Sequence, residues 1–340
     1  MSKKYDTAVF IGRFQPVHNA HYEIMKQALD IAERLIIIVG SADQPRTFKN
    51  PFKTKERFDM IMDLGLDPSR VILESNYDTI YNDNAWAARV QNIVNKYDHL
   101  GTKVCIIGHE KDESSFYLRM FPQWTFEEVS LNEPLNATDI RDLYFRYPAN
   151  YHNFLKAVVP PSVLEFLLYF SGTDEFNNIV LERQFVQTYK KQFESLKYPP
   201  IFVTTDAIVT CLGNVLVVKR KSFPGKGLLA LPGGFLNANS DKSVIDGMLR
   251  ELKEETSIKI PVPVLKGSVV NNKVFDAINR SERGRTITHA FHIDLKNEKE
   301  LPKIKAADDA EDAFWLPLGE MKPSQFFEDH FEIVNYFTGV

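Results

Sequence analysis

Cysteine, long apolar runs and excess positive charge are all scarce in this sequence, and each scarcity excludes a class of protein. The only cysteines, Cys105 and Cys211, lie in apolar stretches, which predicts buried free thiols and excludes a disulfide framework or a cysteine-rich zinc site. The strongest apolar run, LIIIVG at 35–40, is far shorter than the roughly 18 residues that a membrane-spanning helix needs. A net charge of -4 at pH 7 excludes a general attraction to nucleic acid or to an anionic membrane, so any anionic ligand must bind at a local site.

The length and composition indicate a globular protein of two domains. At 340 residues the chain is long enough for two domains of about 150 residues each. Hydrophobic residues make up 44% of the chain and charged residues 25%, which is typical of soluble proteins. The stretch MSKKYDTAVF lacks the apolar core of a secretory signal peptide, so we expect a cytoplasmic location.

Short apolar runs alternate with helical patterns over the first half of the sequence. The runs are rich in β-branched residues, which predicts buried parallel strands at 7–12, 34–41, 70–75 and 103–108. Between them, apolar residues recur at helical spacing over 21–34, 54–65 and 84–97. This alternation predicts a doubly wound α/β sheet in an N-terminal domain of residues 1–172, with ligands at the carboxyl ends of the strands.

The second half of the sequence has a different pattern. A helical periodicity over 173–196 predicts a connecting helix that ends before a pair of prolines. Two apolar stretches then flank LGN at 212–214 and predict a β-hairpin. A helix at 241–256 and a strand at 286–295 follow. We therefore expect an α+β domain with a mixed sheet over 197–340.

The segment GRFQPVHNAH at 12–21 follows the first predicted strand and contains Arg13, His18 and His21. Three explanations are open: a zinc site, a phosphate site, or a polar helix start without a ligand. Zinc needs further ligands, and no acidic residue lies close by in the sequence. A phosphate site explains more of the residues together, because a helix N-terminus attracts anions and these three side chains add donors. Gly12 would let the backbone turn tightly after the strand.

A second segment, NATDIRDLYF at 136–145, adds to the phosphate interpretation. Asn136 is suited to cap a helix that carries Thr138 and Arg141 in its first turn. Arg141 would then reach the terminal phosphates of a triphosphate held by the histidines. Taken alone, the segment is more typical of an ordinary capped surface helix.

These segments carry a family resemblance. GRFQPVHNAH resembles the first signature of the nucleotidyltransferase superfamily, and NATDIR is similar to its second motif. NPFKTKER at 50–57 and YNDNAWAARV at 81–90 resemble the archaeal-type nicotinamide mononucleotide adenylyltransferases. The resemblance implies transfer of AMP from ATP to nicotinamide mononucleotide, which gives NAD and pyrophosphate.

The same resemblance implies the roles of individual residues. ATP would be bound by Gly12, Arg13, His18, His21, Thr138 and Arg141, of which His18, His21 and Arg141 would be catalytic. Asn84 and Trp86 would contact the mononucleotide, although a tryptophan on a helix is as often part of a core. Two positions depart from the family pattern: Ala20 replaces a glycine, and Asn136 lies near an expected serine. Neither departure removes a charge or a donor.

Three glutamates cluster in the segment RELKEE of the predicted helix at 241–256. Glu251, Glu254 and Glu255 share one helix face, where like charges repel unless a hard cation such as Mg²⁺ lies among them. A solvated acidic face is the alternative. The segment and the upstream Gly234 resemble the Nudix box, which implies hydrolysis of a nucleoside diphosphate linked to another group.

The Nudix resemblance implies that Glu251, Glu254, Glu255 and Gly234 hold metal, with the glutamates catalytic and Arg250 orienting one of them. The stretch from Gly234 to Arg250 is longer than the pattern, Asp241 is the nearest candidate for its first glutamate, and Ser257 replaces its last glycine. The segment 274–291 resembles ADP-ribose pyrophosphatases, with Arg283 and Arg285 as ADP-ribose contacts or as part of a solvated basic loop. The acidic run at 308–314 offers Glu311 as a base.

Together the two halves resemble bifunctional enzymes that make NAD in one domain and hydrolyse ADP-ribose to AMP and ribose 5-phosphate in the other. The implied ligands are ATP, nicotinamide mononucleotide, ADP-ribose and Mg²⁺, with Mn²⁺ as an alternative ion at the Nudix site. We expect neither a nucleic-acid partner nor a membrane partner, and leave a homo-oligomer open. The alternatives are a transferase for another phosphate ester with a different Nudix substrate, or a nucleotide-sensing regulator with a non-catalytic Nudix domain.

Overall fold

A computed structural model describes residues 3–98, 101–110, 113–131, 135–146, 151–306 and 310–339 of the chain. It contains two compact units, Met1–Val180 and Leu181–Val340, and the division falls within helix α7 (Asp174–Lys191). Each unit has its own hydrophobic core, so each is described by itself. The domain limits expected from the sequence remain a prediction. Within the described ranges, no helix has both the length and the apolarity needed to cross a membrane.

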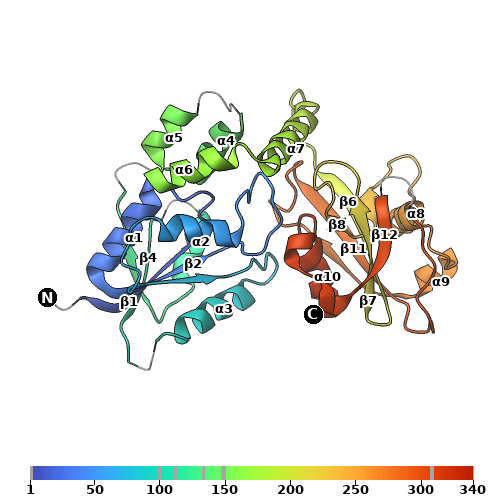
Figure 1. Ribbon diagram of the computed structural model, residues 1–340. Coiled ribbons are helices and arrows are strands. Elements are labelled where there is room, and N and C mark those ends of the chain that lie inside the picture. The colour runs from blue at the N-terminus through green and yellow to red at the C-terminus, as the bar shows by residue number, and fades with distance from the viewer. Residues whose placement is uncertain are drawn as a thin grey trace. The chain divides into compact units, whose positions relative to one another are not determined.

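The first unit is built on a five-stranded parallel sheet in the order β3-β2-β1-β4-β5 (Figure 1). Its strands are β1 (Tyr5–Gly12), β2 (Ala32–Val39), β3 (Val71–Ser75), β4 (Val104–Gly108) and β5 (Thr125–Glu128). Side chains of β2 from Leu35 to Val39 are all fully buried, because helices cover both faces of the sheet. The predicted doubly wound α/β class is confirmed, and β5 is a strand that the periodicity did not indicate.

Two layers of helices enclose this sheet. Helix α1 (Asn19–Ile31) packs in one core with α2 (Thr54–Met62) and with α4 (Ala137–Arg146), α5 (His152–Val158) and α6 (Pro161–Phe170). Helix α3 (Asp83–Asn95) and the 3₁₀ helix η1 (Glu113–Arg119) belong to a second core on the other face. Alternate residues of β1 enter the two cores, as the pleat requires: Ala8 and Phe10 in one, Val9 and Ile11 in the other.

The end of the first predicted helix was wrong. The helical pattern over 21–34 continues past the observed end of α1, whereas the chain becomes extended at Ala32 and enters β2 there without a loop. The buried β-branched run that follows Arg34 pairs with β1 along its whole length. Residues 32–34 therefore belong to the strand and not to the helix, because pairing with β1 favours the extended conformation.

The second unit has a seven-stranded mixed sheet. Its strands are β6 (Phe202–Cys211), β7 (Asn214–Arg220), β8 (Leu229–Ala230), β9 (Gly233–Phe235), β10 (Val269–Phe275), β11 (Thr286–Asp294) and β12 (Ala310–Pro317). Strands β6 and β11 are parallel and the other pairs are antiparallel. The predicted hairpin joins β6 to β7, where Leu212 and Gly213 have φ of 48° and 75°, as a tight hairpin turn requires.

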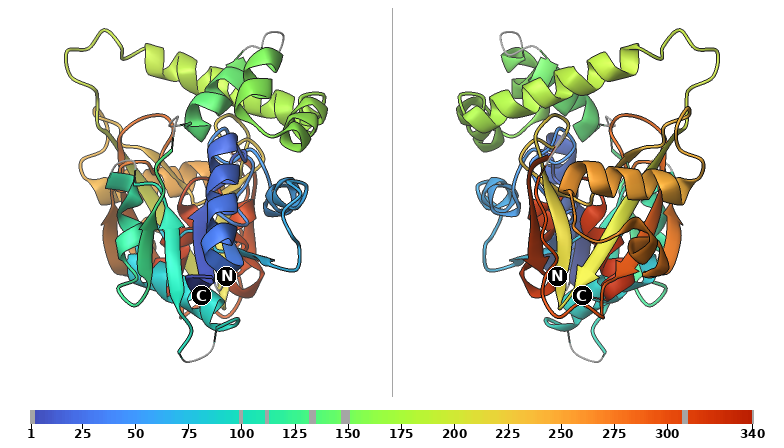
Figure 2. Two further views of the ribbon diagram at one scale, coloured as in Figure 1. Left: turned by 90° about the vertical axis from the view of Figure 1, so that its left-hand side faces the viewer. Right: turned by 90° about the vertical axis from the view of Figure 1, so that its right-hand side faces the viewer.

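Helix α8 (Val244–Thr256) lies across the sheet of the second unit, as the right-hand view of Figure 2 shows in orange. Its buried side includes Met248, Leu249 and Leu252, which pack with β6 and β11. The helix begins after Ser243, whose hydroxyl accepts the Asp246 N–H, and not at 241 as predicted. The other helical elements of the described part are α9 (Val262–Gly267), η2 (Leu318–Glu320), η3 (Pro323–Gln325) and α10 (His330–Thr338).

Candidate active sites

A cavity of about 130 Å³ lies in the first unit, between the carboxyl end of β1 and the start of α1. It is lined by Arg13, Phe14, Gln15, His18, His21, Asn136, Ala137, Thr138 and Arg141. The two segments singled out in the sequence, more than a hundred residues apart, therefore meet at one cavity. This is the edge of the sheet at which a doubly wound fold places its ligands.

The two histidines form a stacked pair at the start of α1. Their ring centroids are 3.6 Å apart with an interplanar angle of 20°. His18 is the N-cap residue, and its backbone N–H donates to His21 Nδ1 at 3.3 Å. A neutral His21 therefore carries its proton on Nε2. Among the described residues, no group of three or more His, Cys, Asp or Glu side chains is placed to hold a metal ion.

Arg141 joins the two segments that line this cavity. Its Nη1 donates to the backbone oxygen of Gln15 at 2.8 Å and its Nη2 donates to Thr138 Oγ1 at 3.1 Å. Asn136 Oδ1 accepts the Thr138 N–H at 2.9 Å, so the predicted helix cap is confirmed. The guanidinium is buried and lies at the cavity wall.

Gly12 does not make the tight turn that the sequence suggested. The left-handed residue is Phe14, with φ of 53°, and Gly12 is absent from the cavity lining. A Cβ at Gly12 would lie 2.8 Å from the ring of Phe14. Gly12 thus allows the Phe14 ring to pack closely against the end of β1. This packing determines where Arg13 leaves the strand.

Arg57 supports the same loop and was missed from the sequence. Its side chain is only 1% exposed and donates to the carbonyl oxygens of Arg13, Gly40 and Ser41 at 2.7, 2.6 and 3.1 Å. Burial lowers the pKa of this guanidinium to about 10. The segment NPFKTKER carried a family signal, but nothing in its local pattern indicated that one arginine would turn inward.

Asn84 and Trp86 lie on α3, away from the residues that line this cavity. Asn84 is exposed, and the half-buried ring of Trp86 lies 6.0 Å from Tyr117 and 6.2 Å from Phe121 between ring centroids. The proposed contact of both residues with a mononucleotide therefore stays a prediction.

Replacing Trp86 by alanine is expected to lower the free energy of unfolding of the first unit by about 3 kcal/mol, because the ring fills the aromatic core under α3. Urea denaturation measures this loss. Ile80→Ala, an exposed apolar control nearby, should change stability by less than about 0.5 kcal/mol. Full stability of the Trp86 variant with a raised KM for the mononucleotide would contradict the core role.

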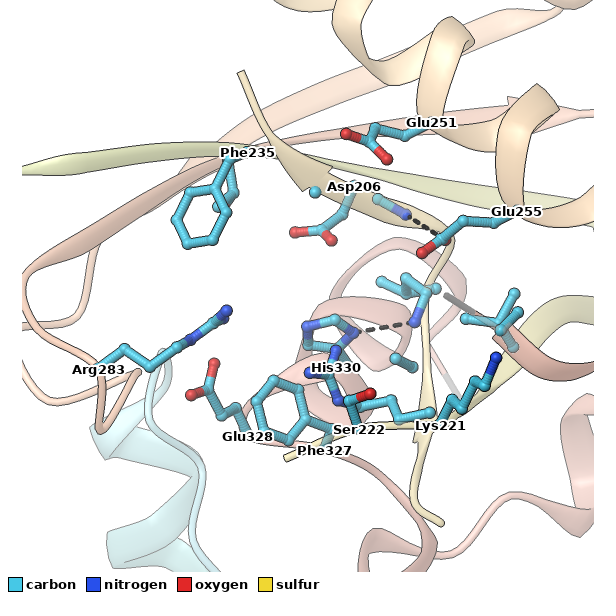
Figure 3. Close-up of a pocket in the computed structure, with 18 of the residues that line it drawn as sticks. Asp206, Lys221, Ser222, Phe235, Glu251, Glu255, Arg283, Phe327, Glu328 and His330 are labelled. Atoms are coloured by element: carbon cyan, nitrogen blue, oxygen red, sulfur yellow. Dashed lines mark hydrogen bonds between the residues drawn. The ribbon is translucent and has the colours of Figure 1, made fainter. Parts of the chain in front are cut away.

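A larger cavity of about 480 Å³ lies in the second unit (Figure 3). Its wall comes from β6, β7, β9 and α8, from the loop before β11, and from the segment that leads into α10. The labelled side chains include acidic, basic and aromatic groups: Asp206, Lys221, Phe235, Glu251, Glu255, Arg283, Phe327, Glu328 and His330.

Two of the three predicted glutamates face this cavity. Glu255 Oε2 accepts the N–H of Gly233 at 3.0 Å, and burial raises the pKa of its carboxyl group to about 8. Burial also raises the pKa of Glu251. A Cβ at Gly234 would lie 2.6 Å from the Glu251 carboxylate, which would then have to move. Neighbouring half-buried carboxylates with raised pKa values suit a hard divalent cation.

Glu254 is the exception among the predicted ligands, because it does not line the cavity. Arg250 Nη1 donates to Glu254 at 2.8 Å and to Glu251 at 2.9 Å, and its other nitrogens hold both oxygens of Asp241 at 2.9 Å. The Arg250 guanidinium lowers the pKa of Asp241 to about 2. Arg250 thus orients the glutamates, and Asp241, the candidate for the first glutamate of the box, serves as its anchor.

The predicted arginine contacts divide in the same way. Arg283 lines the cavity, with its guanidinium carbon 5.1 Å from the Phe235 ring centroid and 5.9 Å from that of Phe327. Arg285 is not in the lining and donates to the Asp276 carbonyl at 2.7 Å. Glu311 is also outside it, 51% exposed and paired with Lys219 at 3.3 Å. The acidic residues at 308 and 309 lie outside the described residues.

Two family models match the chain: cytidylyltransferase-like over residues 9–193, and NUDIX domain over residues 202–337. The chain belongs to the cytidylyltransferase-like family. It also carries a NUDIX domain, so both predicted resemblances are confirmed. Ser257, at the position where the Nudix box has its last glycine, is the C-cap residue of α8. Its φ of 44° is left-handed, which explains why the box has glycine there.

Similar proteins are known for each part and for the whole. The nicotinamide/nicotinic acid mononucleotide adenylyltransferase of Acinetobacter baylyi is 36% identical over 194 residues, which cover 56% of this chain and 97% of that protein. The ADP-ribose pyrophosphatase of Methanocaldococcus jannaschii is 32% identical over 145 residues, 43% of this chain and 76% of that protein.

A solved structure covers nearly the whole chain. The bifunctional NMN adenylyltransferase/ADP ribose pyrophosphatase of Francisella tularensis has a TM-score of 0.90 and is 33% identical, covering 98% of this chain and 99% of that one. A second structure from Francisella tularensis, with a TM-score of 0.89 and 32% identity over 98% and 99% of the two chains, is a complex with AMP and a manganese ion.

The segment 326–330 of the NUDIX domain contributes side chains that sequence reasoning missed. His330 Nδ1 accepts the Leu231 N–H at 2.9 Å, and burial lowers the pKa of the ring, so neutral His330 carries its proton on Nε2. Burial raises the pKa of Glu328 to about 7, against the effect of the nearby Arg283 charge. The available signal was the stretch QFFEDHF, in which two acidic residues and a histidine stand among three phenylalanines, as charges in an apolar stretch.

A buried ion pair fixes this segment to the loop before β11. Arg280 Nε and Nη2 each donate to a carboxylate oxygen of Asp329 at 2.8 Å, and both side chains are at most 2% exposed. Arg280 lies three residues before Arg283, and Asp329 directly follows Glu328. The ion pair therefore connects the two segments that carry the cavity residues Arg283 and Glu328. The wall is therefore held together by a fully desolvated contact.

Asp329→Asn is expected to lower the free energy of unfolding of the NUDIX domain by about 3–5 kcal/mol, because it leaves the buried Arg280 charge without compensation. Denaturant titration of the full chain measures the loss. Glu311→Gln removes the exposed pair with Lys219 and should cost less than about 1 kcal/mol. Equal stability of the two variants would contradict the assigned role of the buried pair.

Proposed function

We propose that this chain is a bifunctional enzyme of NAD metabolism. Its cytidylyltransferase-like domain joins nicotinamide mononucleotide to ATP, and its NUDIX domain hydrolyses ADP-ribose to AMP and ribose 5-phosphate. The observation that carries the proposal is that each unit has a cavity lined by its own motif residues. The Francisella tularensis enzyme, which matches both units together, supports it.

In adenylyl transfer, the 5′-phosphate oxygen of the mononucleotide attacks the α-phosphorus of ATP. The bond from the α-phosphorus to the bridging oxygen breaks, and pyrophosphate leaves with the electron pair. The protein supplies no nucleophile, so its work is to position the reactants and to stabilise negative charge. Arg13, His18, His21 and Arg141 are the donors at the cavity, and the N-terminus of α1 adds its partial positive charge.

Several parts of this first site rest on the family resemblance. Thr138 would bind ATP through its hydroxyl, which now accepts from Arg141. Gly12 would act through the loop that it positions, since its own atoms are not at the cavity. Asn84 and Trp86 would contact the mononucleotide on the α3 side.

In the NUDIX domain, Glu251 and Glu255 with the backbone of Gly234 would hold Mg²⁺ or Mn²⁺, and Glu254 would join them on leaving Arg250. The bound ion supplies charge neutralisation of the diphosphate and an activated water. Arg250 keeps Glu251 in place, while Arg283 and the Nε2–H of His330 offer hydrogen bonds to substrate oxygens. Arg285 lies outside the cavity lining, so it would contribute to ADP-ribose binding only from beyond the cavity wall.

One assay tests both activities. The purified full chain is incubated with ATP and nicotinamide mononucleotide, and separately with ADP-ribose, each with Mg²⁺, with Mn²⁺ and with EDTA. We expect NAD and pyrophosphate in the first reaction, and AMP and ribose 5-phosphate in the second, with hydrolysis abolished by EDTA. Absence of NAD would overturn the first half of the proposal, and metal-independent or absent hydrolysis would overturn the second.

The remaining expectations belong to the same proposal. The transferase domain would span residues 1–172 and the hydrolase domain 197–340, with the segment 173–196 between them. The protein would act in the cytoplasm on small nucleotides, without nucleic acid. Size-exclusion chromatography with light scattering decides between a monomer and a homo-oligomer.

A further inference from the structure

One carboxylate in the NUDIX cavity has no assigned task. Glu328 lies on the wall opposite Glu251 and Glu255, beside Arg283 and Phe327, as Figure 3 shows. Its Oε1 atom is buried and, within the described part of the chain, has no hydrogen-bond partner. A buried acceptor without a partner is costly, so its retention at a cavity wall indicates a ligand group that satisfies it.

The backbone also holds Glu328 in an unfavourable conformation. Its φ is 47°, in the left-handed region that glutamate rarely adopts. The neighbouring residues enforce this geometry, because Asp329 is bound to Arg280 and His330 is bound to Leu231. Strain that the surroundings enforce is typical of residues that contact ligands.

The charges around Glu328 narrow the chemistry of its ligand. Arg283 lies close by, yet no ion pair between the two is found among the described residues, and Arg283 Nε is itself buried without a hydrogen-bond partner. A carboxylate repels the diphosphate, which belongs at the opposite wall with Glu251 and Glu255. An ionised carboxylate only accepts hydrogen bonds, and Ser281 already donates one to Glu328. Oε1 is the acceptor left for a ligand, and a neutral hydroxyl group of the substrate matches it.

We propose that Glu328 is a specificity-determining residue whose Oε1 accepts a hydrogen bond from a vicinal diol of the substrate. The inference rests on the proposed hydrolysis of a nucleoside diphosphate sugar. ADP-ribose contains such a diol in each of its two riboses, and the experiment separates these sources. Glu328 would thereby exclude substrates in which that sugar is missing or deoxygenated.

The test compares three substrates with wild type, Glu328→Ala and Glu328→Gln. The substrates are ADP-ribose, the cyclopentylmethyl ester of ADP, which lacks the second sugar's hydroxyls, and ADP-ribose with a 2′,3′-dideoxyadenosine. In wild type we expect kcat/KM to fall by about 10²-fold for one of the two analogues. With Glu328→Ala, kcat/KM for ADP-ribose should fall by a similar factor. For the analogue that wild type hydrolyses poorly, kcat/KM of the variant should equal that of wild type. Glu328→Gln, which keeps one acceptor oxygen, should lie between them, and Glu320→Ala is the exposed control.

Each outcome bears on the inference. The analogue whose discrimination is lost identifies the ribose that Glu328 contacts. If Glu328→Ala discriminates against both analogues as wild type does, the inference is overturned, and a uniform fall of kcat on all three substrates would assign Glu328 to the chemical step instead. Thermal unfolding of each variant shows that it is folded. If wild type hydrolyses none of the substrates, it is the proposed function that fails.

Discussion

Replacing His18 by alanine is expected to lower the rate of NAD formation by about 10²–10³-fold, because it deletes a preorganised donor at the cavity that receives the phosphates. His18 also stacks on His21 at 3.6 Å, so its loss leaves the second imidazole less firmly oriented. Initial rates of pyrophosphate release, with ATP and nicotinamide mononucleotide at saturation, measure the effect. Hydrolysis of ADP-ribose by the same preparation should be unchanged, since the NUDIX cavity shares no residue with this one.

The matched control for His18 is His152→Ala, which removes an exposed histidine at the start of α5. Its rate should stay within about threefold of wild type. A His18 variant that also kept such a rate would refute the donor role. Stoichiometric zinc in the wild-type protein, lost on mutation of His18, would revive the metal explanation of the histidine pair.

Glu255→Gln is expected to abolish ADP-ribose hydrolysis and to weaken binding of Mg²⁺ or Mn²⁺ strongly, because it removes one of the two glutamates of α8 that face the NUDIX cavity. The helix should survive, since its buried residues Met248, Leu249 and Leu252 are untouched. Isothermal titration with Mn²⁺ measures binding, and release of AMP measures hydrolysis. Adenylyl transfer should persist. Unchanged metal-dependent hydrolysis by this variant would contradict the assignment.

The raised pKa of Glu255 gives the same variant a pH signature in metal-free protein. The folded-state pKa of about 8 lies above the ordinary value of 4.5, so between these values the folded state binds a proton that the unfolded state has released. Wild-type stability should therefore fall, relative to Glu255→Gln, as the pH rises from 4.5 to 8. Chemical denaturation at several pH values in EDTA measures this. Glu300→Gln, at an exposed glutamate, should show no such difference.

Much of the fold and of the first site could be predicted from the sequence. In a parallel sheet the polar residues that follow a strand must gather at one edge, so Arg13 and His18 could be placed at a ligand site from periodicity alone. The family motif then added Thr138 and Arg141, and these line the same cavity. Each of these positions depends on local pattern and on which end of a strand it follows.

The second site was less predictable, because its wall combines short segments whose side chains are directed by long-range contacts. Glu254 shares a helix face with Glu251, yet an ion pair with Arg250 holds it outside the cavity. Arg285 lies two residues from Arg283 and bonds a backbone carbonyl instead. Glu328 and His330 belong to no motif, and only the fold brings them opposite α8. Helical spacing predicts which residues share a helix face, but not which of them will form an ion pair with a neighbouring side chain.

The composition of the two cavity walls implies an order of assembly during synthesis. The lining of the first cavity is complete once Arg141 has been made, and the core around it draws on residues up to Ile179. In the NUDIX cavity wall, Leu231 is hydrogen-bonded to His330, 99 residues later in the sequence. The partner of Arg280, Asp329, is likewise synthesised near the end of the chain. A nascent chain therefore carries a folded transferase while its hydrolase is an open sheet with exposed apolar surface. A chain truncated before residue 326 would keep all residues of the transferase cavity. Its NUDIX segment would stay unfolded, and proteases would degrade the protein from there.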